Sequence, residues 1–442
     1  MSVSRVLHKS SFRTGAMLAV LFIVAVTVRW TVLSTAGQIF GNYGLQSAKM
    51  FGIDASRTPK PNVLQQSLTV HWRYDQGAVM NPVAVRGVVY GGTVSSPFEV
   101  VALNIKNGHP LWATPVNNQV MTMPLVIGNR VFVGKGNSLF PEVPQIGQAN
   151  IRGTGSSSVM ALSAKTGQVL WQVPTQGEDM PTPVYWQGDL YVVGGSDQLM
   201  EISPVTGQIL RTLPIPSYVS MSSPVVSQGV LYFGGAYPYT FYAVNLRTWR
   251  VQWQTPVSGA TGALDDCPPL LVGHNIYTEA VKTVDGRNTF YAIDIDKATG
   301  HIRWQHALGT GPLPYSASGR ASNESGIPTF HAGVLYLGSP ITKTLYALNA
   351  RTGAVLWSNG LNHKGITQAP LYVHGQLLVG DSQGTLWDVN AKTGDVLHQT
   401  AVGGAFMPSV PLLVGQTLIV GTRAPSLSAF PLTTIAPALG GH

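Results

Sequence analysis

A thirteen-residue phrase recurs along the chain and constrains the fold more than any other feature. Each copy is a strand of alternating apolar residues, a turn that in most copies is centred on Thr-Gly or Asn-Gly, and a second strand that ends on a large side chain. The turn glycine is expected because a short hairpin requires positive φ. The copies span 100–112, 159–171, 199–211, 241–253, 290–304 (with two extra residues), 345–357 and 386–398. A period of roughly 40 to 60 residues made of strands alone predicts a propeller or a β-solenoid.

A second pattern decides between these two architectures. A proline is followed by an apolar strand, a turn and a glycine-rich strand in eight segments: 81–93, 123–136, 182–196, 223–236, 268–280, 327–339, 369–381 and 410–422. The half-phrase missing from the eighth unit is split between the chain ends, with 67–77 as the outer strand and 426–432 as the third strand. We therefore expect an all-β, eight-bladed propeller over 65–432, closed by pairing the N- and C-terminal strands, which removes exposed sheet edges.

The repeat carries the pattern A-x-[DN]-x-x-T-G-x-x-x-W, matched best by 161–171, 347–357 and, with its two extra residues, 292–304. In this pattern the chain resembles the quinoprotein (PQQ)-type β-propeller repeat family. The large residues that end the phrases are Trp72, Trp112, Trp171, Trp253, Trp304 and Trp357, with Arg211 and His398 in the two other positions. The resemblance implies that the tryptophans dock between neighbouring blades. It specifies architecture and not chemistry.

The N-terminal region predicts export. Basic residues precede the apolar run 16–28, which is too short to span a bilayer comfortably, and Ser34-Thr35-Ala36 follows it. We interpret 1–36 as either a cleaved signal peptide or an N-terminal anchor that tethers the protein to the inner membrane. A linker over 37–64 and a C-terminal tail over 433–442 flank the propeller. Both alternatives predict a periplasmic or extracellular protein.

The charge and the cysteine content of the chain indicate the environment of the protein and the kind of ligand that it binds. Charged residues make up 10% of the chain, against roughly 25% in ordinary soluble domains, and the net charge is +8. Few carboxylates are expected on a surface that faces acidic water, as in an acidophile. The basic balance suits a small anionic substrate, and nucleic acid is not expected because no Lys/Arg cluster occurs. The single cysteine, Cys267, excludes an intramolecular disulfide.

Candidate site residues come from the segments just before the aligned prolines, which we expect at one mouth of the central channel. Blade five has Asp265, Asp266 and Cys267 there, and a long loop of blade six adds Glu324. A carboxyl group in such a funnel can transfer protons, and a thiol can act as a nucleophile or bind sulfur. Alternatively, the aspartates cap a turn before Pro268 and the cysteine is a small buried filler.

Polar residues of neighbouring blades are candidates for binding the substrate. They are Ser222, Arg320, Asn323, Lys364 and Gln368. No metal site is expected. The insertion 138–158 in blade two, rich in Gly, Pro and Ser, is expected to form a homodimer contact or to cover the mouth.

Three classes of function remain open on this scaffold. In its export signal, sparse charges, and Cys267 beside carboxylates, the chain resembles tetrathionate hydrolases. That resemblance implies hydrolysis of a sulfur oxyanion without a cofactor. The alternative is a non-catalytic periplasmic scaffold similar to the outer-membrane assembly propeller. A second alternative is a dehydrogenase that uses pyrroloquinoline quinone (PQQ) with Ca²⁺, although the chain lacks the adjacent cysteines of that class. No HExxH, CxxC, P-loop or GxSxG motif is present.

Overall fold

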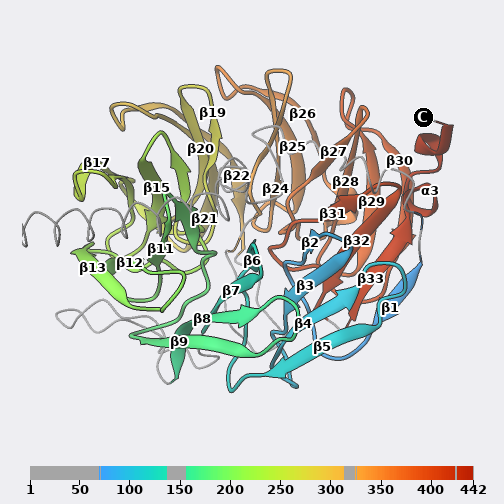
Figure 1. Ribbon diagram of the computed structural model, residues 1–442. Coiled ribbons are helices and arrows are strands. Elements are labelled where there is room, and N and C mark those ends of the chain that lie inside the picture. The colour runs from blue at the N-terminus through green and yellow to red at the C-terminus, as the bar shows by residue number, and fades with distance from the viewer. Residues whose placement is uncertain are drawn as a thin grey trace, which may run out of the picture.

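The predicted eight-bladed β-propeller is confirmed. The computed structural model describes residues 69, 71–136, 156–312, 324, 326–423 and 426–441. Eight sheets, seven of four strands and one of five, follow one another around a ring (Figure 1). The predicted segments 1–36 and 37–64, and most of the insertion 138–158, lie outside the described residues. Within the described ranges, no helix has the length and apolar character needed to cross a membrane.

The first four blades each consist of four consecutive antiparallel strands. Blade one contains β2 (Val83–Val85), β3 (Val88–Gly92), β4 (Glu99–Asn104) and β5 (Pro110–Pro115). Blade two contains β6 (Leu125–Ile127), β7 (Arg130–Lys135), β8 (Ser157–Ser163) and β9 (Val169–Thr175). Blade three contains β10 (Val184–Trp186), β11 (Asp189–Val193), β12 (Gln198–Ile202) and β13 (Ile209–Pro214). Blade four contains β14 (Val225–Ser227), β15 (Val230–Gly235), β16 (Thr240–Asn245) and β17 (Arg250–Pro256).

The other four blades include the enlarged blade five and the closing blade eight. Blade five contains β18 (Ala260–Gly262), β19 (Leu270–Val272), β20 (Asn275–Val284), β21 (Arg287–Asp296) and β22 (Ile302–Gly311). Blade six contains β23 (Thr329–His331), β24 (Val334–Ser339), β25 (Thr344–Asn349) and β26 (Val355–Asn359), followed by the 3₁₀ turn η2 (Leu361–His363). Blade seven contains β27 (Leu371–Val373), β28 (Gln376–Gly380), β29 (Thr385–Asn390) and β30 (Val396–Ala401). Blade eight contains β31 (Leu412–Val414), β32 (Thr417–Thr422), β33 (Ser426–Pro431) and β1 (Trp72–Tyr74), and the chain continues into α3 (Leu432–Ile435) and η3 (Pro437–Gly441).

The two ends of the propeller sequence close the ring, as predicted. Strand β1 pairs with β33 in antiparallel register, with Trp72 opposite Ala429 and Tyr74 opposite Leu427. Figure 1 shows the blue β1 lying against the red β33. The last blade therefore has no unpaired seam between the chain ends.

Each tryptophan of the predicted row joins its blade to the next one, as the resemblance implied. The indole N–H donates to a backbone carbonyl beside the turn of the following blade: Trp72 to Ile105, Trp112 to Ala164, Trp171 to Pro204, Trp253 to Lys297, Trp304 to Ala350 and Trp357 to Ala391, at 2.8–3.2 Å. The ring also packs on the glycine of that turn. A Cβ on Gly353, for example, would lie 2.7 Å from Trp304. Since Gly353 also has φ of 72°, glycine is required there for two separate reasons.

The junction between blades three and four reverses this arrangement. Arg211 occupies the tryptophan position of blade three, and Trp249 occupies the turn position where other blades have glycine. The guanidinium of Arg211 lies 4.1 Å from the centroid of Trp249, and the indole donates back to the carbonyl of Thr212 at 3.1 Å. Arg211 also donates to Leu246 O and pairs with Glu201, so the junction keeps both its ring contact and its hydrogen bonds.

The C-terminal segment occupies the junction between blades seven and eight. His398, at the tryptophan position of blade seven, is exposed. Instead, Leu432, Ile435 and Leu439 of α3 and η3 are buried in one cluster with residues of blades seven and eight. The predicted tail is therefore packed on the propeller.

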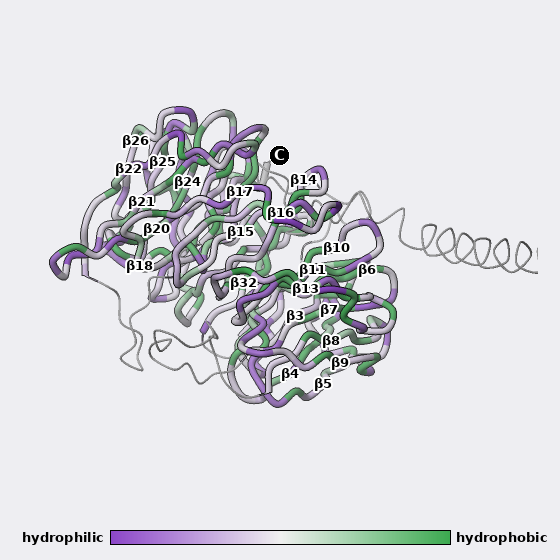
Figure 2. Tube along the Cα trace, turned by 90° about the vertical axis from the view of Figure 1, so that its left-hand side faces the viewer, coloured by the Kyte–Doolittle hydropathy of each residue, from purple (hydrophilic) through white to green (hydrophobic). Residues whose placement is uncertain are grey.

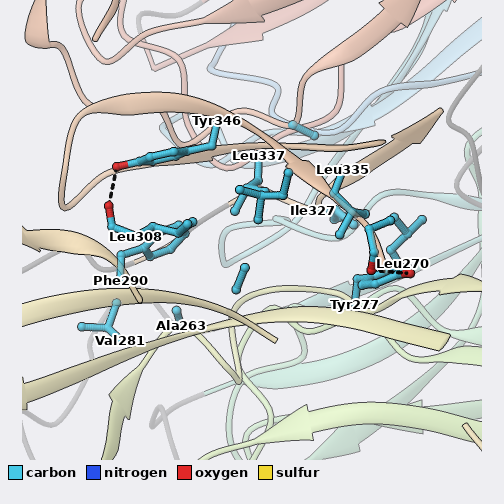
Figure 3. Packing of buried hydrophobic residues seen from close by; sticks show 14 of the residues in the cluster. Ala263, Leu270, Tyr277, Val281, Phe290, Leu308, Ile327, Leu335, Leu337 and Tyr346 are labelled. Atoms are coloured by element: carbon cyan, nitrogen blue, oxygen red, sulfur yellow. Dashed lines mark hydrogen bonds between the residues drawn. The ribbon is translucent and has the colours of Figure 1, made fainter. Parts of the chain in front are cut away.

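Blade five is the largest blade and shares a core with blade six. Its three strands β20, β21 and β22 are 10 residues each, and the β20–β21 hairpin turns at Asp285 and Gly286. Figure 3 shows Phe290 and Tyr277 of blade five facing Leu335 and Tyr346 of blade six, with the Tyr346 hydroxyl donating to Leu308 O at 2.7 Å. In Figure 2, hydrophilic residues gather at many of the turns, while the strands carry the apolar residues that pack between blades.

We predict that Arg211 and Trp249 are energetically coupled. Arg211→Trp alone places two indoles in one junction, and Trp249→Gly alone leaves the arginine without its ring. The double variant recreates the contact seen at the other junctions. Each single variant is expected to lower the free energy of unfolding by about 1–3 kcal/mol, and the double variant by less than their sum. Urea unfolding of the four proteins measures this coupling, and strictly additive losses would contradict it.

Candidate functional site

The candidate site is a cavity on the propeller axis, built from the segments that precede the first strand of each blade. Residues four positions before that strand form one ring of the lining: Met121, Met180, Met221, Asp266 and Pro408. Residues two positions before it form a second ring: Asn81, Met123, Thr182, Ser223, Pro268, Ile327 and Val410. Gly326 and Ser409 complete the lining, and the empty space is about 460 Å³, part of it open to solvent.

One further residue per blade lies between the two rings. In blades six and eight it is Gly326 and Ser409 of the lining, whereas in blades four, five and seven its side chain is turned toward a neighbouring blade. In several blades this side chain joins its own second strand to the next blade. Ser222 Oγ accepts from Gly234 N at 3.2 Å and donates to Cys267 O at 3.0 Å. Gln368 accepts from Gly380 N at 2.8 Å and donates to Ser409 Oγ at 3.2 Å. Both predicted substrate-binding side chains are therefore engaged in joining blades.

The structure separates the predicted catalytic residues of blade five. Asp266 lines the cavity, whereas Asp265 is buried behind it, and its backbone carbonyl accepts from Met221 N at 2.9 Å and Ser222 N at 2.7 Å. Cys267 holds the position that faces the next blade, and it is fully buried with Sγ 3.6 Å from Pro268 O. The three residues lie in a turn where the amides of Asp266 and Cys267 donate to Ala263 O.

The remaining predicted residues lie around blades six and seven. Glu324 is half-buried and lies two residues before Gly326 of the cavity lining. Lys364 is half-buried and follows η2. Arg320 and Asn323 lie outside the described residues. No described cation is among the residues that line the cavity.

A cluster of tyrosines lies beside the blade-five aspartates. Rings of Tyr218 and Tyr237 are 5.6 Å apart between centroids, and those of Tyr237 and Tyr239 are 5.5 Å apart. Burial, and next the charge of Asp265, raise the pKa of Tyr239 far above its usual value. Its phenol therefore stays protonated and remains a hydrogen-bond donor.

Four other aspartates have raised pKa values because burial disfavours their charged form. Burial raises the pKa of Asp179 to about 8, with the hydroxyl of Thr175 opposing and Glu178 adding to the shift. The pKa of Asp388 rises to about 7, and those of Asp189 and Asp294 to about 6, again chiefly through burial. Asp296 is the opposite case, since its pairing with Arg303 lowers its pKa.

The methionines of the cavity were missed by reasoning from the sequence. Met121, Met180 and Met221 hold the same position in three consecutive blades, four residues before the first strand. That recurrence is visible in the sequence once the blades are aligned on their prolines. Methionine is also an ordinary filler of apolar cores, so the recurrence alone does not mark a site.

The raised pKa values predict a fold that is more stable in acid. The folded state keeps the protons of Asp179 and Asp388 up to pH about 8 and 7, whereas an unfolded aspartate loses its proton near 3.9. The unfolding free energy should therefore fall as pH rises from about 4 to 8, by about 1.4 kcal/mol per unit of raised pKa. Thermal unfolding across this range measures the slope.

Asp179→Asn and Asp388→Asn should each make that dependence shallower, because an amide cannot ionise. Asp285→Asn, at the exposed hairpin turn of blade five, is the matched control and should leave the slope unchanged. A melting temperature that rises from pH 4 to pH 8 would contradict the assignment.

Comparison with known proteins places this ring and cavity in a family. A family profile described as outer membrane protein assembly factor BamB matches residues 66–305 and 290–434. The chain is 29% identical over 324 residues to the tetrathionate hydrolase of Acidithiobacillus ferrooxidans, covering 70% of this chain and 63% of the relative. It is 27% identical over 297 residues to the outer membrane protein assembly factor BamB of Yersinia pestis, covering 64% of this chain and 67% of the relative. The match to the tetrathionate hydrolase thus spans less than two thirds of that protein's length.

Solved structures extend the likeness of fold. A europium-containing methanol dehydrogenase superposes with a TM-score of 0.60 at 14% identity, covering 85% of this chain and 88% of that one. At such identity the likeness concerns the propeller alone.

Proposed function

The chain belongs to the family described as outer membrane protein assembly factor BamB, and within it we propose a hydrolase of sulfur oxyanions with tetrathionate as substrate. The observation that carries this proposal is the carboxyl group of Asp266 in the axial cavity of a chain 29% identical to a tetrathionate hydrolase. Asp266 is the acid/base residue of the proposal. Asp265 is buried next to Asp266 in the sequence and forms part of the environment of the Asp266 carboxyl group.

The cavity offers the other groups that hydrolysis needs. Thr182, Ser223 and Asn81 provide hydroxyl and amide groups in the same lining as Asp266. Donors of this kind can orient a water and stabilise charge that develops on sulfonate oxygens. Outside this lining, the protonated phenol of Tyr239 lies in the field of both aspartates.

The reaction balances with water as the only co-reactant. Asp266 takes a proton from a water whose oxygen bonds to a sulfonate sulfur, and the adjacent S–S bond breaks with its electron pair going to the departing sulfur chain. Sulfate leaves, and the chain sheds one zero-valent sulfur atom to give thiosulfate. One tetrathionate and one water thus yield thiosulfate, sulfate, sulfur and two protons.

Binding of the sulfonate groups is assigned to residues from the loops of blades six and seven. In this proposal Arg320 and Lys364 supply positive charge, Asn323 donates hydrogen bonds to the sulfonates, and Glu324 assists catalysis. The thiol of Cys267 takes no part in the steps above, because its side chain faces the next blade. Ser222 and Gln368 act through the blades that they join.

A PQQ–Ca²⁺ centre does not fit the residues of this cavity. Ca²⁺ takes six to eight oxygen ligands, chiefly from carboxylates, carbonyls and water, whereas the side chains of this lining offer one carboxylate, one amide and three hydroxyls beside four thioethers. Within the described ranges, no group of three His, Cys, Asp or Glu side chains is placed to hold a metal. Catalysis without a cofactor remains a prediction, tested by turnover with no quinone added.

The family match favours one competing function, a non-catalytic periplasmic scaffold. Such a protein would bind an outer-membrane assembly partner and turn over nothing. Export is common to both functions, and we propose a periplasmic or extracellular location reached through residues 1–36. The homodimer remains a proposal that rests on the insertion 138–158.

We predict that the purified protein releases thiosulfate and sulfate from tetrathionate at about pH 4, near the ordinary pKa of an aspartic acid of about 3.9, where a carboxylate is available to accept a proton from water. Asp266→Asn should lower kcat by about 10²–10⁴-fold, the usual contribution of a general acid or base. Ion chromatography of both products measures the rate and checks the stoichiometry.

Asp285→Asn is the matched control, since it makes the same substitution at an exposed turn of the same blade. It should retain full turnover. Equal activity of Asp266→Asn and this control would overturn the acid/base assignment. No turnover by the folded parent protein would favour the scaffold.

A further inference from the structure

Four of the 11 methionines of the chain line the axial cavity. Met121, Met180 and Met221 belong to one ring of the lining and come from consecutive blades, and Met123 lies in the adjacent ring. Equivalent positions of consecutive blades are neighbours around the axis. Three methionine side chains thus line neighbouring sectors of the cavity wall.

These thioethers are open to a ligand in the cavity. Met121 and Met221 are half-buried, while Met123 and Met180 are 5% and 4% exposed. Their neighbour in the same ring is Asp266, and no described cation lines the cavity. The cavity therefore combines neutral sulfur donors with one acidic group, which favours a cation over an anion at this level.

The donor set determines which cation fits. Thioethers are soft ligands that select Cu(I) among biological metal ions. Ca²⁺ and Mg²⁺ require several oxygen ligands, and structural zinc sites are built from thiolate and imidazole. We propose that Met121, Met180 and Met221 form a Cu(I) site on the propeller axis, with Asp266 supplying the balancing charge.

A thioether site behaves differently in acid from other copper sites. Imidazole and thiolate ligands take up protons as the pH falls, so their metal affinity is lost. A thioether has no proton to gain in this range. The affinity of the three thioethers should therefore change by less than about tenfold between pH 7 and 5.

Ag(I) is the probe, since it shares the soft character of Cu(I) and does not change oxidation state in air. Every protein carries Cys267→Ser, because a thiol would bind Ag(I) by itself. Calorimetric titration of the full chain in chloride-free buffer at about pH 5, where most histidines are protonated, should give one tight site. Met121→Leu, Met180→Leu and Met221→Leu should each weaken binding at least about tenfold.

Met160→Leu and Met200→Leu are the matched controls. Both side chains are buried in the blades, outside the cavity lining, and exchanging Met for Leu nearly conserves volume. Their Ag(I) affinity should equal that of the parent. X-ray absorption of the Cu(I)-loaded protein should show sulfur neighbours that disappear in the triple variant.

Three outcomes would overturn the site. One is Ag(I) binding that is absent from the folded parent protein, and another is binding by the cavity variants that equals that of the two controls. The third is tight binding by the unsubstituted chain, titrated for comparison, that is lost in the Cys267→Ser parent, which assigns the metal to the thiol. All of these readouts are independent of tetrathionate turnover, so the site can fail without the proposed hydrolase failing.

Discussion

The contact between a tryptophan of one blade and the turn glycine of the next organises the whole ring. The indole N–H satisfies a backbone carbonyl, as between Trp304 and Ala350 at 3.2 Å, and the ring fills space that only Gly353 leaves open. Because this contact lies at the outer strands, it sets the angle between blades far from the axis. The inner segments are then free to vary, and the cavity-lining residues differ from blade to blade.

Most of the fold could be predicted from the sequence because each blade repeats the same local physics. Alternating apolar residues and turn glycines identify the strands, and the split half-phrase at 67–77 and 426–432 identifies the closure that β1 and β33 make. Only one half of the exchange of Arg211 and Trp249 could be predicted from the sequence. Arg211 stood out in the row, but the partner that compensates for it lies at a turn position of another blade.

Less of the candidate site could be predicted, because the local backbone decides which of several adjacent side chains reaches the cavity. Sequence adjacency grouped Asp265, Asp266 and Cys267 as one cluster, but the three residues lie in a turn that directs their side chains differently. Only Asp266 lines the cavity, while Cys267 and Ser222 face the next blade. The cavity lining is found by comparing residues two positions apart, and by comparing equivalent residues of consecutive blades.

The specialised part of this protein lies in the asymmetry of one repeated position. Four residues before the first strand, blades two to four place Met121, Met180 and Met221, and blade five places Asp266. Contacts between blades are made by the side chain one position further along the chain. The side chain at the lining position therefore takes no part in those contacts. Substitution there can change ligand chemistry without loosening the ring. A soft sulfur surface beside one carboxyl group suits sulfur chemistry and soft-metal binding alike, which is why hydrolysis and Ag(I) affinity must be measured separately.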